Sequence, residues 1–194
     1  MTLYPRRKKS SAIQRKVPLT VGRPSLLRNG SDRAFRQFVH RLLAFTARLQ
    51  GVRNGLAELI GLSGMQYTIL ISIAHLEQES DVNISTLSEH LHISGAFATI
   101  ETGQLVRKGL VKKRVSNLDR RRVCLSVTQE GRMLLTELAG TQSRANDLIF
   151  ASLKKQDLER ILELLGHLIE GGDAAAAFLD LAAAQRKSAK HAAA

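Results

Sequence analysis

Three consecutive arginines, Arg120, Arg121 and Arg122, follow Asp119 in a short polar segment. Guanidinium groups are permanently charged and carry five N–H donors, so a cluster of them suits phosphate binding. Apolar residues alternate with polar ones on both sides of this segment, which is typical of strands with one buried face. Residues 110–128 are therefore predicted to form a β-hairpin whose cationic tip can enter a nucleic-acid groove; a solvated polar tip is the alternative. The alternating apolar residues are Val111, Val115, Val123, Leu125 and Val127.

Basic residues occupy two separate regions of this chain of 194 residues, whose formal net charge is +12. Residues 1–30 contain eight Lys and Arg, no acid and all three prolines, which predicts a flexible basic arm. Residues 103–122 contain another eight against the single acid Asp119. So basic a chain indicates a polyanionic partner.

Residues that could support catalysis or metal binding do not form a recognisable constellation. Cys124 is the only cysteine, which excludes a disulfide within the chain and a cysteine-based zinc site. His90 and His92 are two positions apart on an expected helix, where side chains do not face each other. Glycine-rich phosphate loops, GxSxG and HExxH motifs are absent from the sequence. We therefore expect neither an enzyme nor a bound metal or cofactor.

The sequence also lacks the features of a membrane protein. No apolar run approaches the roughly 20 residues of a membrane span, and the basic N-terminus lacks the apolar stretch of a secretory signal. A transit peptide is the remaining alternative at that end. We expect a cytoplasmic protein without membrane contact.

A mainly α fold is predicted, with a winged helix-turn-helix at residues 62–128 inside a domain of residues 31–172. Ser31 or Asp32 begins a long helix whose apolar residues are spaced as in a helix–helix seam: Phe35, Phe38, Leu42, Phe45, Leu49 and Val52. Ser63 begins a second helix over residues 65–77, a short strand is expected at 83–84, and Ser85 and Ser94 begin the helices on either side of a tight turn. Thr128 begins a fifth helix. A sixth starts at Gln156 or Asp157, repeats the seam spacing at Leu158, Ile161, Leu165 and Leu168, and is expected to break at Gly171 and Gly172, before an Ala-rich extension of residues 173–194.

Four segments, in this order, resemble the MarR (multiple antibiotic resistance regulator) family of transcription factors. They are residues 62–70, 85–94, 105–111 and 119–131, and the last, with Asp119-Arg120-Arg121 and Gly131, is the most specific. The resemblance implies a homodimer formed by residues 31–60 and 129–172, bound to a palindromic double-stranded DNA operator. It also implies that Asp119 orients Arg121 by an ion pair, while the wing arginines reach into the minor groove.

The expected recognition helix, residues 95–108, departs from the family pattern. The family commonly turns arginines or polar residues towards the bases, whereas here Phe97 and Ile100 occupy the outward positions, and Glu101 and Thr102 the inward ones. Contacts of apolar residues with thymine methyl groups are a plausible substitute; a rotated helix with Phe97 in the core is the alternative. The expected DNA-binding residues are Ser94, Ala96, Phe97, Thr99, Ile100 and Gln104, with Lys112 and Asp119 to Arg122 of the wing.

The resemblance also implies a ligand pocket between the first two helices. The residues expected to line it are Arg36, His40, Arg41, Gln66 and Tyr67, and this mixture suits an anionic aromatic effector, an aromatic acid or its coenzyme A thioester. Solvated or interhelical ion-pair roles are the alternative for each. The sequence thus predicts a homodimeric repressor released by such a ligand; a sequence-tolerant DNA-organising protein, and more remotely an RNA-binding protein, are the alternatives.

Overall fold

The computed structural model describes residues 18–115 and 123–192. These form the helices α1 (Arg33–Leu59), α2 (Gly64–Leu76), α3 (Ile84–Leu91), α4 (Gly95–Arg107), α5 (Gln129–Phe150) and α6 (Lys155–Ala192), and the strands β1 (Val111–Val115) and β2 (Val123–Val127). The chain divides into two compact units, one ending at Ala139 and the other beginning at Gly140. The first contains the winged helix-turn-helix, so the expected mainly α fold is confirmed.

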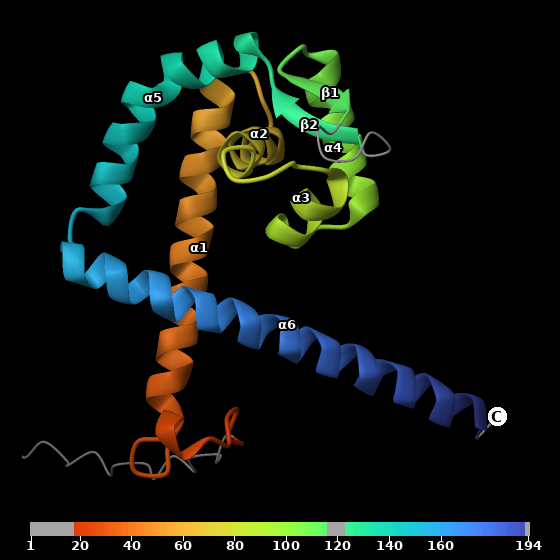
Figure 1. Ribbon diagram of the computed structural model, residues 1–194. Coiled ribbons are helices and arrows are strands. Elements are labelled where there is room, and N and C mark those ends of the chain that lie inside the picture. Colours follow the sequence, from red (N-terminus) through yellow and green to blue (C-terminus); the bar gives the residue numbers. More distant parts are fainter. Residues whose placement is uncertain (1–17, 116–122, 193–194) are drawn as a thin grey trace, which may run out of the picture. The chain divides into compact units, whose positions relative to one another are not determined.

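Helix α2 forms the centre of the first unit. Ser63 begins it with a capping box, in which the Ser63 hydroxyl accepts a hydrogen bond from the Gln66 amide and the Gln66 side chain accepts one from the Ser63 amide. Its residues Ile69, Leu70 and Ile73 are completely buried. Helices α1, α3 and α4 and strand β2 all contact α2 (Figure 1), so the winged helix is built around one apolar helix.

Helix α3 begins earlier than the sequence suggests. Asn83, not Ser85, is its N-cap, and the Asn83 side chain accepts a hydrogen bond from the Thr86 amide at 3.0 Å. The expected strand at residues 83–84 is likewise wrong: the only pairing in this region is a single bridge between Val82 and Leu125. Both errors have one cause, because Asn83 can be read either as a strand end or as a cap.

The hairpin is antiparallel, and its pairing runs from Val111 opposite Val127 to Val115 opposite Val123. The face expected to be buried is buried only at the base, where Val111, Leu125 and Val127 are at most 2% exposed. Val115 and Val123 are both 56% exposed. Residues 116–122, including Asp119 and the three arginines, lie outside the described residues.

Thr128 begins α5 as expected, since its hydroxyl accepts a hydrogen bond from the Gly131 amide at 3.0 Å. Gly131 is required there by close packing: a Cβ at this position would lie 2.8 Å from the Val127 side chain and closer still to the Leu110 carbonyl oxygen. Helix α5 then crosses into the second unit.

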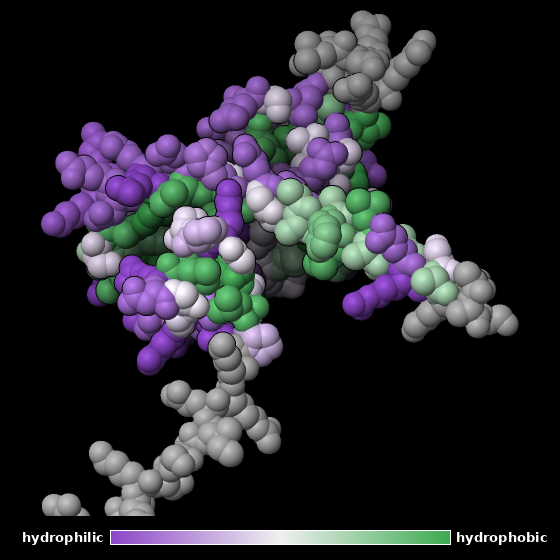
Figure 2. All heavy atoms as spheres, turned by 90° about the horizontal axis from the view of Figure 1, so that it is seen from below, coloured by the Kyte–Doolittle hydropathy of each residue, from purple (hydrophilic) through white to green (hydrophobic). Residues whose placement is uncertain are grey.

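Helix α6 continues through Gly171 and Gly172, so the predicted break is wrong. Ala-rich sequence on the C-terminal side has a high helix propensity that offsets the cost of two glycines. Figure 2 shows hydrophobic residues on the surface of this half of the helix and hydrophilic ones near its end. Phe178, Leu179 and Leu181 are each about two-thirds exposed.

Residues 18–30 are structured, although the sequence suggests an arm throughout residues 1–30. They include a turn of 3-10 helix, Pro24–Leu26, and a bridge between Arg28 and Ser31. Asp32 is 1% exposed, and its carboxylate accepts hydrogen bonds from the amide and the hydroxyl of Thr20, both at 2.7 Å. Asp32 is the N-cap residue of α1 but makes no capping bond, because its side chain holds Thr20 and pairs with Arg36 instead.

Within the described residues, no single helix is long and apolar enough to cross a membrane. Helices α1 and α2 meet that test only as a pair joined across an 89° bend.

Candidate nucleic-acid interface

The turn between α3 and α4 exposes the start of α4. His92 ends α3 in the left-handed conformation, with φ 51° and ψ 48°. Ser94 then caps α4 as expected, its hydroxyl accepting a hydrogen bond from the Phe97 amide at 3.2 Å. Ser94, Gly95 and Ala96 are all exposed, so this end of the helix is accessible to a partner.

The two faces of α4 differ as the sequence predicts. Ala98, Thr102 and Leu105 are at most 1% exposed and face the core. Phe97 is 38% exposed and Ile100 is 58% exposed, with Ala96 and Thr99 beside them. The alternative of a rotated helix with Phe97 in the core is therefore wrong.

Gln104 lies in a polar cluster between α4 and α2. Its amide oxygen accepts a hydrogen bond from Gln66 Nε2 at 2.8 Å, and its Nε2 lies 3.5 Å from Glu101 Oε1 as a donor. Gln66 Nε2 also donates to Glu101 Oε2 at 3.3 Å. The oxygen and the nitrogen of the Gln104 amide are thus both hydrogen-bonded within the protein. The amide therefore does not offer the free donor and acceptor pair that the base contact expected from the sequence requires.

Strand β1 of the wing is anchored by its own cation. Arg114 pairs with Asp81 of the α2–α3 loop, and this hydrogen bond raises the pKa of the Arg114 guanidinium above its ordinary value. Lys112 and Lys113 on the same strand are exposed. Strand β1 therefore offers two lysines to a polyanion and uses Arg114 for its own anchoring.

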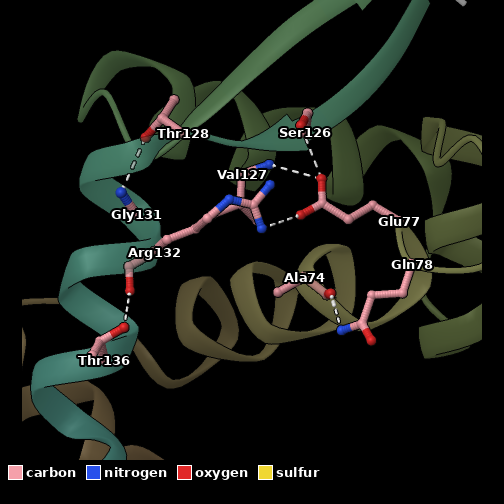
Figure 3. A network of polar contacts seen from close by, with 9 residues as sticks. All are labelled: Ala74, Glu77, Gln78, Ser126, Val127, Thr128, Gly131, Arg132 and Thr136. Carbon is pink, nitrogen blue, oxygen red and sulfur yellow. Dashed lines mark hydrogen bonds and ion pairs between the residues drawn. The ribbon is translucent and has the colours of Figure 1, made fainter.

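Glu77 connects the end of α2 to both the wing and α5 (Figure 3). One carboxylate oxygen accepts hydrogen bonds from the Ser126 hydroxyl at 2.9 Å and from the Val127 amide at 3.2 Å. The other carboxylate oxygen lies 2.9 Å from Arg132 Nη1. The two groups form an ion pair, but their geometry is not that of a hydrogen bond. The Glu77 side chain is only 10% exposed, which strengthens these interactions.

The five expected effector-binding residues do not share one surface. Tyr67 is 1% exposed beneath the Arg53 guanidinium, and burial raises the pKa of its hydroxyl. Gln66 is buried in the cluster described above, and Arg36 pairs with Asp32 at 2.9 Å. His40 and Arg41 are exposed on α1.

Residues 60–122, which contain α2, α3, α4 and β1, match the model of the MarR family. This winged-helix segment belongs to the MarR family.

Solved MarR structures resemble a larger part of the chain. The transcription regulator MarR from Oenococcus oeni PSU-1 is 22% identical, covers 68% of this chain and 98% of its own, and has a TM-score of 0.59. CouR from Rhodococcus jostii RHA1, solved with p-coumaroyl-CoA, is 21% identical, covers 67% of this chain and 90% of its own, and has a TM-score of 0.59. MepR of S. aureus, solved with DNA, is 15% identical, covers 77% of this chain and 99% of its own, and has a TM-score of 0.54. At these identities the likeness shows the MarR fold, and a search of the curated proteins finds no match.

Three residues that support the MarR-type wing, Glu77, Asp81 and Arg114, were not identified from the sequence. In the sequence, Arg114 is one of the basic residues of segment 103–122, and nothing distinguishes it from its lysine neighbours. One signal exists: acids cluster at the end of α2 and in the α2–α3 loop, whereas β1 is basic. Their partners are 33 to 55 positions away, so spacing alone does not reveal them.

Proposed function

We propose that this protein is a homodimeric transcriptional repressor that binds a palindromic DNA operator. Helix α4 enters the major groove and the arginines of the wing enter the minor groove. The observation that carries this proposal is an exposed α4 beside exposed Lys112 and Lys113, within a segment that matches the MarR family. A second helix of a helix-turn-helix is the element that reads bases in such proteins.

The dimer is proposed from apolar surface that each unit leaves exposed. On α1, Phe38 is 50% exposed and Leu42 and Phe45 are each 39% exposed. On α6, Leu158, Leu165 and Leu168 are between 43% and 52% exposed. Apolar surface at seam spacing on two helices is suited to a twofold interface, which places two copies of α4 on successive turns of DNA.

An anionic aromatic effector, an aromatic acid or its coenzyme A thioester, is proposed as the signal that releases the DNA. His40 and Arg41 are exposed on α1, and their imidazole and guanidinium groups can hold the charged end of such a ligand. CouR, which has the same fold, was solved with p-coumaroyl-CoA. Release requires that the effector prefer the conformation that does not bind DNA, since equal affinity shifts no equilibrium.

The proposal is tested by footprinting the full-length protein on the DNA that flanks its own gene, with and without aromatic acids and their thioesters. We expect one protected palindrome, bound at least about 1,000-fold more tightly than random duplex, and its release by a ligand of this class. Uniform protection of all duplexes would contradict the operator. Continued protection with every ligand would contradict the effector alone.

A second function, sequence-tolerant organisation of DNA, is favoured by one observation. Between Gly95 and Gln104, α4 presents no outward cation or free amide, the groups that most often discriminate bases. The same footprint decides between the two functions. Sedimentation that shows only monomer at micromolar concentration would contradict the dimer in either case.

A further inference from the structure

The outward face of α4 carries the wrong chemistry for the usual contacts with guanine and adenine. Phe97 and Ile100 are exposed on it, and the neighbouring Gly103 has no side chain. Thr99 is the outward polar residue, and its hydroxyl already donates to the Gly95 carbonyl oxygen at 2.7 Å. The surface offered to a groove is therefore apolar.

Folding of the single chain does not account for this arrangement. Thr102 occupies a completely buried position, and its hydroxyl has no hydrogen-bond partner there. Ile100, which is larger and has no polar group, is outside. An unpaired hydroxyl is costly to bury, and an isoleucine left in water forgoes the free energy of burial, so neither position has the residue type that folding favours. The exposed isoleucine is thus better explained by a partner than by the core.

One base presents an apolar group in the major groove: thymine, through its C5 methyl. We propose that Phe97 and Ile100 recognise thymine methyl groups, so that operator choice depends on the positions of A·T pairs facing α4. Lys112 and Lys113 supply contacts to phosphates that do not depend on sequence. This inference rests on the proposed function, since it requires α4 to lie in the major groove.

The test begins with a random duplex pool, from which the full-length protein selects its tightest sites. Thymines of the selected duplex are then replaced one at a time by deoxyuridine, which lacks the C5 methyl and keeps the same base pair. Affinity is measured by fluorescence anisotropy. We expect a loss of about fourfold at each contacted thymine, the factor that corresponds to the burial of one methyl group.

Two variants identify the protein side of the contact. Ile100→Ala should weaken binding to thymine DNA and remove the effect of deoxyuridine at one position of each half-site. Lys112→Ala is the matched control and should weaken binding to both DNAs by the same factor. Ile100 is exposed, so its truncation leaves the core intact, which circular dichroism verifies.

The outcomes separate this inference from the function on which it rests. A selected site that tolerates deoxyuridine at every position overturns thymine recognition and leaves the regulator intact. An unchanged deoxyuridine effect in Ile100→Ala and in Phe97→Ala overturns the assignment to these residues. Failure to enrich any sequence overturns both the inference and sequence-specific regulation.

Discussion

Glu77→Ala should destabilise the winged helix more than truncation of either of its side-chain partners, Ser126 or Arg132. The carboxylate is the shared acceptor for Ser126, Val127 and Arg132 (Figure 3), and it is nearly buried. Removing it leaves the Val127 amide without an acceptor in a strand residue that is 2% exposed. Truncating Ser126 or Arg132, by contrast, removes a single interaction with Glu77.

The three contacts of Glu77 differ in strength. The two hydrogen bonds to the carboxylate are of the charged kind, worth about 1.5 kcal/mol or more each. The ion pair adds little, because Arg132 is 56% exposed and exposed pairs contribute about 0–1 kcal/mol. We therefore expect a loss of about 3 kcal/mol for Glu77→Ala and of less than about 1 kcal/mol for Arg132→Ala.

Urea unfolding followed by near-ultraviolet circular dichroism measures these losses. The chain has no tryptophan and two tyrosines, and Tyr67 of α2 is buried in the core, so its signal reports on this unit. Glu79→Ala is the matched control: it removes the same charge from an exposed position and should cost less than about 0.5 kcal/mol. Equal losses for Glu77→Ala and Arg132→Ala would refute the reasoning, because the ion pair would then dominate.

Three further predictions concern the wing tip, the arm and its attachment. Arg121→Ala should lower operator affinity more than Lys112→Ala, and its combination with Asp119→Ala should cost less than the sum in a double-mutant cycle; additive losses would show that the two act independently. Deleting residues 1–17, which contain six Lys and Arg, should flatten the dependence of log affinity on log salt; a changed operator preference would show that they read bases. The Asp32→Asn variant should lose less of its free energy of unfolding on acidification than the unsubstituted chain. The hydrogen bonds from Thr20 hold the pKa of the folded Asp32 carboxyl below its ordinary 3.8. The stability that Asp32 contributes is therefore complete above pH 3.8 and is lost as the pH falls through the lowered pKa. Identical unfolding profiles of both proteins from pH 6 to pH 2 would contradict this.

Most of the fold is predictable from the sequence because its signals are local. Ser63, Ser94 and Thr128 each precede a helix and cap it as expected, and alternation in the hairpin predicts both strands. The errors arise where two local signals compete. Asn83 suits a strand end as well as a cap, and Gly171-Gly172 suggests a break that the Ala-rich sequence after it overrides.

The site is less predictable, because its polar partners are remote in sequence. The inward and outward faces of α4 follow from helical spacing, so the exposure of Phe97 and Ile100 could be predicted. The engagement of Gln104 could not, since it depends on Gln66, 38 residues earlier. Asp32 illustrates the same limit: its type predicts a cap, but a contact with Thr20 uses its carboxylate instead.

The α2–α3 loop and the end of α2 together determine where the wing lies. Glu77 holds β2 through Ser126 and Val127, the Val82 carbonyl oxygen accepts a hydrogen bond from the Leu125 amide at 2.7 Å, and Asp81 holds β1 through Arg114. Both strands are thus held by a segment of six residues, while Val115 and Val123 towards the tip are exposed. The three acids in this segment, Glu77, Glu79 and Asp81, also offset part of the positive charge that the wing concentrates. Because the same Glu77 pairs with Arg132 of α5, a displacement of the start of α5 acts directly on the strand that leads to the wing tip. Under the proposed function, this contact couples the helix that leaves the winged domain to the strand that carries the DNA-binding wing tip.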